Sequence, residues 1–312
     1  MKSVLRLAGT LLLWFTCCYY SFLKQGDLKF SEYITSLLPL RYTSELTVFE
    51  EQEDAVICAL RLYSGNGFNL HAQIRNPRIP GKVPAILLLG GMMTGKKAVE
   101  YAYHIDHVLL ISPDYPYEVR SKYNIWTMLS DIHKAHQALH LQIRDNLVLL
   151  DFLRTWDRID TSKISLIGYS FGVPFACATT ELDKKLKGLA LIYGGADLKY
   201  LLQKNFKLYH SFVDEVLIHL FGVFLSDFEP SRHAANLKLL PVILINGEFD
   251  KKIPEESARS LQNAIPFEKT VIWLPTDHVH PKNRSLSLGI ITHLRQWYKE
   301  HNLNGEIRQF QG

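Results

Sequence analysis

The stretch Ile164-Ser165-Leu166-Ile167-Gly168-Tyr169-Ser170-Phe171-Gly172 joins a short apolar run to a Gly-x-Ser-x-Gly pentapeptide. An apolar run of this length predicts a buried strand. A pentapeptide directly behind it is typical of a nucleophile elbow, in which serine occupies a tight strand-to-helix turn. The glycines have no Cβ, so the turn can close and the next helix can pack near the strand. A glycine-rich turn without catalytic function can have the same Gly, Ser and Gly, so the flanking sequence must distinguish the two.

Short apolar runs and helical patterns alternate along the chain and predict an α/β fold. Asn66-Gly67 separates two alternating runs and predicts an antiparallel β-hairpin at the start. The later runs predict a mostly parallel sheet with helices on both faces. The expected strands are 55–62, 68–74, 85–89, 108–111, 164–167, 189–192, 242–245 and 270–274; the expected helices are 96–103, 125–156, one starting at 171–178, 255–264 and 286–298.

Residues 198–236 interrupt this alternation with a helical segment that is rich in aromatic side chains. The segment is more apolar than a solvent-facing connector should be. We therefore expect a helical cap insertion that packs over the end of the sheet and that could line an acyl or aryl pocket.

Two loops that follow the late strands carry an acid and a histidine. Asn246-Gly247-Glu248-Phe249-Asp250 follows the strand 242–245, with Ile253-Pro254 just beyond, and Thr276-Asp277-His278-Val279-His280 follows the strand 270–274. With the serine, these loops resemble the serine α/β-hydrolases, of the esterase and dienelactone-hydrolase kind, over about 55–298. That family places serine, acid and histidine in this order at the carboxyl ends of strands, with the acid in a Gly-x-x-Asp-x-x-(apolar)-Pro loop.

The resemblance implies a catalytic triad. Serine is a weak nucleophile unless an imidazole takes its proton and a carboxylate orients that imidazole. Ser170 would be the nucleophile, His278 the general acid and base, and Asp250 the orienting acid. Glu248 is an alternate acid, and Asp197, after an earlier strand, is a further candidate that helix capping also explains.

His280, two residues after His278, is an alternate for the histidine. The triad would also need an oxyanion hole, made of backbone N–H groups. The resemblance places one donor at Phe171 and the other at Gly91 or Met92, in a glycine-rich loop similar to the family's His-Gly-x loop. Leu89 stands where the family has histidine, which leaves the backbone donor intact and puts the supporting contacts of the loop in doubt.

Composition excludes several other functions. The 312 residues carry a net charge of +4 with scattered acids, so no nucleic-acid tract is indicated. No phosphate loop is present, and the four cysteines have neither disulfide nor zinc spacing. His133, His136 and His140 stand at helical spacing, which favours a solvated helix face over a metal site. We expect no cofactor and no metal.

The first residues of the chain read as a membrane or export signal. Lys2 and Arg6 precede a stretch of 17 uncharged residues, 7–23, and Lys24 follows it. This length suits a short membrane span and exceeds a signal-peptide core. Basic residues ahead of it place the remainder outside the cytoplasm. We expect a signal-anchor or signal peptide at 1–24, a linker at 25–54 and a hydrolase domain at 55–312, membrane-anchored on the extracytoplasmic side or secreted after cleavage.

The expected function is a serine hydrolase that cleaves a small carboxylic ester through an acyl-serine intermediate. The same triad serves acyltransferases, thioesterases and peptidases, because one fold hosts many reactions. A catalytically silent binding protein of the same fold is the alternative from another class. The sequence specifies neither the acyl and alcohol groups nor the oligomeric state.

Overall fold

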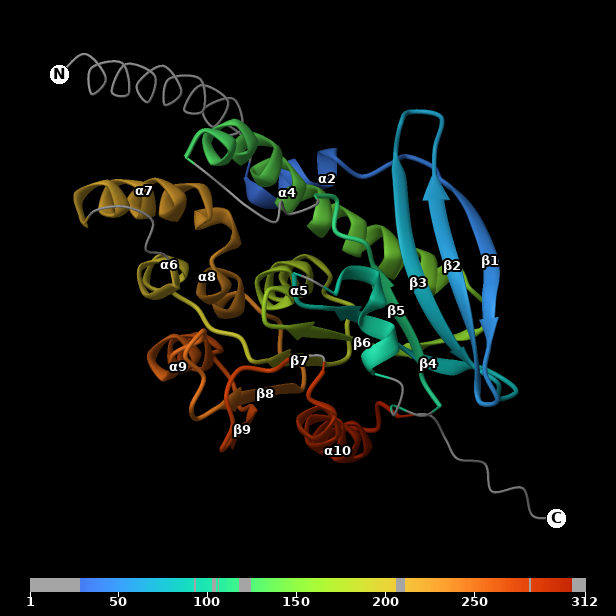
Figure 1. Cartoon of the computed structure of the whole chain (residues 1–312). Helices are drawn as coiled ribbons and strands as arrows, with labels where there is room; N and C mark the ends of the chain where they lie inside the picture. Colours follow the sequence, from blue (N-terminus) through green and yellow to red (C-terminus); the bar gives the residue numbers. More distant parts are fainter. Residues whose placement is uncertain are drawn as a thin grey trace.

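The computed structural model describes residues 29–92, 94–102, 105, 107–117, 125–205, 211–280 and 282–304; at 125–133, 211–214, 216, 217 and 220 it describes the backbone alone. Its strands form one nine-stranded sheet in the order β1-β2-β3-β5-β4-β6-β7-β8-β9 (Figure 1). The strands are β1 Thr43–Glu51, β2 Ala55–Tyr63, β3 Asn69–Pro77, β4 Val83–Leu89, β5 Leu109–Pro113, β6 Ile159–Tyr169, β7 Leu189–Ile192, β8 Val242–Gly247 and β9 Thr270–Leu274.

The sheet is antiparallel at one end and parallel through the rest. β1, β2, β3 and β5 pair antiparallel. β5, β4, β6, β7, β8 and β9 pair parallel, so their carboxyl ends meet at one edge. Hydrophobic cores lie on both faces: in β4, Leu87 and Leu89 enter one core and Ile86 and Leu88 the other. This double burial explains why the strand sequences are continuous apolar runs.

Helices cover the two faces unequally. One core includes residues of α2, α4, α5, α8 and α9, and the other includes residues of α3 and α10 (Figure 1). The bounds are α2 Phe30–Ser36, η1 Gly95–Lys97, α3 Ala98–Tyr101, α4 Ile125–Thr155, α5 Gly172–Leu182, α6 Leu198–Asn205, α7 Ser211–Phe224, η2 Ser226–Phe228, α8 Pro230–Ala235, α9 Glu255–Ala264 and α10 Arg284–Glu300.

The sequence predictions of fold class, hairpin and elements are confirmed, with differences at the ends. β6 begins at Ile159 rather than at 164, because its first residues include the polar stretch 160–163, which an apolar pattern misses. The helix expected at 96–103 is a 3-10 turn, η1, followed by the single turn of α3.

The linker expected at 25–54 is corrected. From residue 29 on, this stretch contains α2 and the edge strand β1, which pairs with β2 along its length. Ile34 of α2 is fully buried in the core, and Tyr42 donates a 2.8 Å hydrogen bond to Asp151 of α4. The strand escaped prediction because every residue of β1 is exposed, so no buried face imposes a pattern on it.

The segment 1–24 lies outside the described residues. Among the helices that the structure does describe, none combines the length and apolar character needed to cross a membrane.

The helical insertion is confirmed for its described residues, as α6, α7, η2 and α8. Its helix α8 packs on α5 and α9, and η2 packs on α5. In Figure 1, α8 lies between α5 and α6, and α6 lies between α7 and α9, all on the side away from α10.

The first turn of α5 passes close to the backbone of β4 at Gly172. A Cβ on Gly172 would stand 2.2 Å from the carbonyl oxygen of Leu89, whereas a Cβ on Gly289, exposed within α10, would meet nothing within 4 Å. We expect Gly172→Ala to lower the free energy of unfolding by at least about 2 kcal/mol, because the backbone of β4 must shift. Gly289→Ala should raise it by about 0.5–1 kcal/mol through helix propensity.

Urea unfolding followed by circular dichroism checks both variants. An unchanged urea midpoint for Gly172→Ala would contradict the prediction, because it would show that the space between α5 and β4 accepts a methyl group.

Candidate active site

Ser170 occupies a strained turn between β6 and α5. Its φ is +48°, in the left-handed region that a residue with a side chain seldom adopts. Its backbone N–H donates to the carbonyl of Ile192 in β7 at 2.8 Å, and its own carbonyl accepts from Val173 at 3.0 Å. The neighbouring strand and the helix start therefore hold the serine in a conformation that costs about 1–3 kcal/mol elsewhere.

The two glycines that flank this serine are required by packing. A Cβ on Gly168 would stand 2.7 Å from Ala176 in α5, and one on Gly172 would strike the backbone of β4. Both residues have negative φ, so their role is to allow close approach rather than an unusual conformation. The elbow predicted from the sequence is present in this sense.

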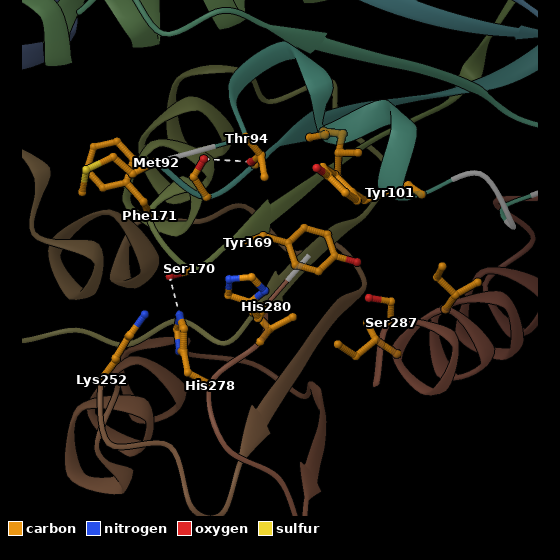
Figure 2. Close-up of a pocket in the computed structure, with 18 residues that line it drawn as sticks. Met92, Thr94, Tyr101, Tyr169, Ser170, Phe171, Lys252, His278, His280 and Ser287 are labelled. Carbon is orange, nitrogen blue, oxygen red and sulfur yellow. Dashed lines mark hydrogen bonds between the residues drawn. The ribbon is translucent and has the colours of Figure 1, made fainter. Parts of the chain in front are cut away.

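The structure brings Ser170, His278 and Asp250 into one hydrogen-bonded series. Ser170 Oγ lies 3.0 Å from His278 Nε2, and His278 Nδ1 lies 2.6 Å from Asp250 Oδ2 (Figure 2 shows the first bond). Nδ1–H donating to the carboxylate leaves Nε2 as the acceptor for the serine hydroxyl. This is the tautomer that a general base needs.

Backbone groups fix the carboxylate of Asp250. Its Oδ1 accepts from the N–H groups of Lys252 and Ile253, at 2.8 and 3.0 Å, while Oδ2 faces the imidazole. The acid side chain is almost fully buried. The loops after β8 and β9 also bind one another, since Phe249 N–H donates to the Thr276 carbonyl at 3.1 Å.

The alternate residues, all within the described part of the chain, make no hydrogen bond to Ser170, although His280 lines the same cavity. Glu248 is exposed to solvent beside the acid loop. His280 is exposed as well, and its Nδ1 accepts from the backbone of Lys282 at 3.2 Å. Asp197 accepts from the N–H of Tyr200 at 3.0 Å and so caps α6, which is the structural role that the sequence also allowed for it. None of these three described residues is therefore hydrogen-bonded to Ser170.

The glycine-rich loop after β4 lies opposite His278. Gly91 and Met92 line the same cavity as Ser170 and Phe171 (Figure 2). The carbonyl of Gly91 accepts from both the N–H and the hydroxyl of Thr94, at 3.0 and 2.8 Å.

Tyr115 supplies the support that Leu89 cannot give to this loop. Its hydroxyl donates to the carbonyl of Gly90, and its ring stacks edge-on against Phe171, 5.4 Å between centroids. Burial raises the pKa of Tyr115, so the hydroxyl keeps the proton that it donates. Sequence reasoning missed this residue, since it follows a different strand, β5; the run Asp114-Tyr115 after that strand was its only signal.

A cavity of about 410 Å³ opens in front of Ser170. Its walls are mostly apolar and come from α3, α10 and the strand ends; Lys252 and His280 add polar groups (Figure 2). No described residue of the insertion 198–236 lines it, so the possibility that part of the insertion lines the pocket is not met by those residues. Further lining residues that sequence reasoning missed are Thr94, Ala98, Tyr101, Ala102, Tyr169, Ser287, Ile290 and Ile291.

The predicted solvated face of α4 is also corrected. His136 and His140 are 5% and 1% exposed, and both contact the ring of Phe228 from η2. The side chain of His133 lies outside the described residues. Segments distant in sequence cover this helix face, which its own periodicity does not reveal.

Comparison of the sequence with protein families and with curated proteins finds no match. Similar solved structures exist. Acetyl xylan esterase 1 from Thermoanaerobacterium sp. JW/SL YS485 is 16% identical, with a TM-score of 0.61 over 86% of this chain and 92% of that one. The acetyl xylan esterase from Paenibacillus sp. R4 is also 16% identical, with a TM-score of 0.62 over 84% and 92%.

A puromycin-hydrolyzing peptidase of Mycobacterium tuberculosis is 17% identical, with a TM-score of 0.60 over 79% of this chain and 39% of that one. At such low identity these likenesses concern the fold. Together with the sheet order and the elbow, they show that the chain has the α/β-hydrolase fold.

Proposed function

We propose that the chain is a serine hydrolase that cleaves carboxylic esters through an acyl-serine intermediate. The observation that carries the proposal is the series from Ser170 through His278 to Asp250, with distances of 3.0 and 2.6 Å, at the wall of an apolar cavity. A serine alone would not suffice; the base must be in hydrogen-bond reach and itself oriented. The esterases among the similar structures support ester chemistry.

The first half of the reaction forms the acyl-enzyme. Ser170 Oγ attacks the ester carbonyl carbon while His278 Nε2 takes the hydroxyl proton, and the carbonyl π electrons move onto oxygen. The N–H groups of Phe171 and of Gly91 or Met92 bind this oxyanion. The intermediate collapses, the bond from carbon to the alcohol oxygen breaks, and His278 returns the proton to the departing alcohol.

The second half releases the acid. A water molecule attacks the acyl carbon as His278 Nε2 takes its proton, and collapse of the second intermediate returns the proton to Ser170 Oγ. Asp250 stays ionised throughout and stabilises the imidazolium that forms in each half. An amine, thiol or alcohol acceptor in place of water would give acyl transfer through the same residues.

We propose an apolar chain as the part of the ester that fills the cavity between α3 and α10. Ala98, Ala102, Ile290 and Ile291 are buried there and offer no hydrogen bond to a polar substrate. Pockets of this size bury most of a small ligand and select by shape.

We also propose that the segment 1–24 holds the hydrolase at the extracytoplasmic side of a membrane. The support is the uncharged stretch 7–23 between basic residues. A cleaved segment would instead give a secreted enzyme.

The first functional prediction concerns the triad. Ser170→Ala should abolish labelling by a fluorophosphonate, and Ser170→Ala or His278→Ala should lower kcat for p-nitrophenyl esters by about 10⁶-fold, Asp250→Asn by about 10⁴-fold. His280→Ala and Glu248→Gln are the matched controls and should retain activity within about tenfold, because neither side chain contacts the serine. Folded protein that resists the label would exclude the enzyme reading and favour a silent binding protein.

The second prediction concerns the cavity. Ser287 lines it well away from Ser170 (Figure 2), so Ser287→Phe should shorten it. We expect kcat/KM for p-nitrophenyl octanoate to fall at least about tenfold relative to p-nitrophenyl acetate, because the longer chain loses its apolar contacts.

Leu288→Phe is the control for Ser287→Phe, since residue 288 is the exposed neighbour on the same helix and does not line the cavity. Equal loss for the two esters, or the same loss in the control, would place the substrate chain elsewhere.

The third prediction concerns the membrane. The full chain should sediment with membranes and resist alkaline extraction. Leu12→Arg with Leu13→Arg should release it, because each arginine costs about 3 kcal/mol at the centre of a span. Fractionation with an antibody to a carboxyl-terminal tag measures this. Full-length protein found entirely in the soluble fraction would contradict anchoring.

A further inference from the structure

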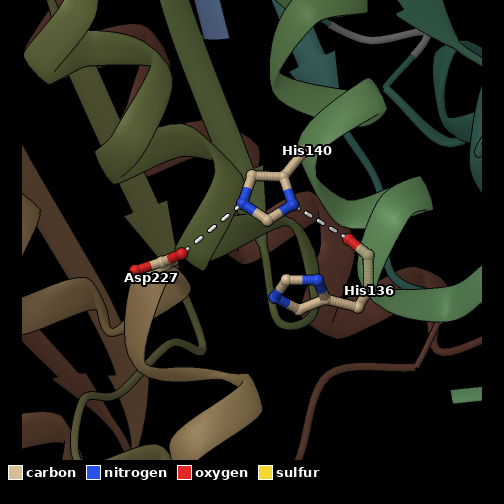
Figure 3. Close-up of side chains that lie close together, drawn as sticks. All are labelled: His136, His140 and Asp227. Atoms are coloured by element: carbon tan, nitrogen blue, oxygen red, sulfur yellow. Dashed lines mark hydrogen bonds and ion pairs between the residues drawn. The ribbon is translucent and has the colours of Figure 1, made fainter. Parts of the chain in front are cut away.

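Two buried histidines and a carboxylate converge on the far side of α5 from α10. His136 and His140 stand one turn apart on α4, where positions i and i+4 share a face, and Asp227 comes from η2 (Figure 3). One nitrogen from each histidine and one oxygen of the carboxylate lie within 4.8 Å of one another. The three residues belong to segments about ninety positions apart, so the fold brings them together.

The hydrogen bonding of His140 prepares it as a ligand. Its Nδ1 lies 3.1 Å from the carbonyl oxygen of His136, and a carbonyl can only accept, so Nδ1 carries the proton. In the neutral ring, Nε2 then has no proton, and its lone pair is directed toward Asp227. An outer hydrogen bond that fixes the tautomer in this way is the usual arrangement for a metal-binding histidine.

The distance between Nε2 of His140 and Oδ2 of Asp227 also suits a shared ion. It is 3.6 Å, too long for a hydrogen bond. Two ligand atoms that each lie about 2.1 Å from one tetrahedral ion stand about 3.4 Å apart. The separation is thus close to that expected across a metal, and without an ion the same two groups can form an ion pair when His140 is protonated.

Neighbouring groups hold the cluster and keep it dry. The ring of Phe228 lies 4.7 Å from that of His140, and Tyr33 packs edge-on at 5.0 Å. His233 Nε2 donates to the backbone carbonyl of Asp227 at 2.7 Å, and its Nδ1 lies 2.6 Å from Glu181. Since His233 makes both contacts as a donor, it positions the carboxylate segment and is not itself a ligand.

The charges nearby and the open space beside Asp227 are compatible with a cation. Arg232 Nη1 lies 3.9 Å from Oδ1 of Asp227, the oxygen that does not face His140. The Arg232 side chain is exposed to solvent, and that of Asp227 is partly exposed. Asp227 lines a second cavity, of about 210 Å³, so the carboxylate side of the cluster adjoins open space, whereas neither histidine is among the residues that line this cavity.

We propose that His136, His140 and Asp227 bind a divalent transition-metal ion, with Zn²⁺ the best match. Two imidazole nitrogens and one carboxylate oxygen are ligands that Zn²⁺ prefers, and water would complete four-coordination. The ion would fasten η2 of the insertion to α4. The site is separate from the triad and does not depend on the proposed hydrolase activity.

Calorimetric titration of the full chain with Zn²⁺, after chelator treatment, tests the site. It is done in a His278→Ala, His280→Ala background, so that the histidines of the active site do not contribute. We expect one ion per chain with a dissociation constant of about 1 µM or below. Zn²⁺ should also raise the melting temperature, because it binds only the folded state.

Asp227→Asn, at a partly exposed position, and His140→Gln should each weaken binding at least about 100-fold and remove the thermal shift. His219→Gln, an exposed histidine of α7, is the matched control and should change neither. Folded protein that takes up no stoichiometric Zn²⁺, or Asp227→Asn that binds as tightly as the control, would overturn the proposal.

Discussion

The site depends on how closely the first turn of α5 passes the end of β4. Gly172 lies against the carbonyl of Leu89 with no room for a side chain. That contact sets the helix against the neighbouring parallel strand, and it therefore fixes the elbow relative to the loop of Gly91 and Met92. Ser170, the proposed nucleophile, and the proposed oxyanion donors are positioned by one backbone contact, so their alignment does not rely on mobile side chains.

Close backbone contacts also position the loops that carry Asp250 and His278. β8 and β9 are neighbours, and a Cβ on Gly247 would lie 2.5 Å from the Thr276 carbonyl, so the loop of the acid lies directly on the loop of the histidine. The turn N–H groups that bind Asp250 then orient His278 through its carboxylate. Backbone contacts at four strand ends thus define the geometry, which explains why the motif survives the replacement of the usual loop histidine by Leu89.

The sequence predicted the parts of the molecule that a local constraint determines. The buried strands, the elbow and the order of Ser170, Asp250 and His278 each leave a local signature, because burial on two faces or a tight turn restricts residue type. β1 left none, because both its faces are in solvent. Tyr115 left only its position after β5, because it acts on a loop that is far from it in sequence. Such long-range contacts are outside the reach of periodicity.

The insertion shows the same limit with a consequence for specificity. Its aromatic character predicted a cap over the end of the sheet that could line a pocket, yet Phe228 packs on Phe175 of α5 and on His140 of α4. Phe228 thus covers two helices, α4 and α5, and no described residue of the insertion lines the cavity. Among the described residues, α3 and α10 are the helices that supply most of the cavity wall, so substrate selection by the proposed hydrolase would depend on these two helices and not on the described part of the insertion.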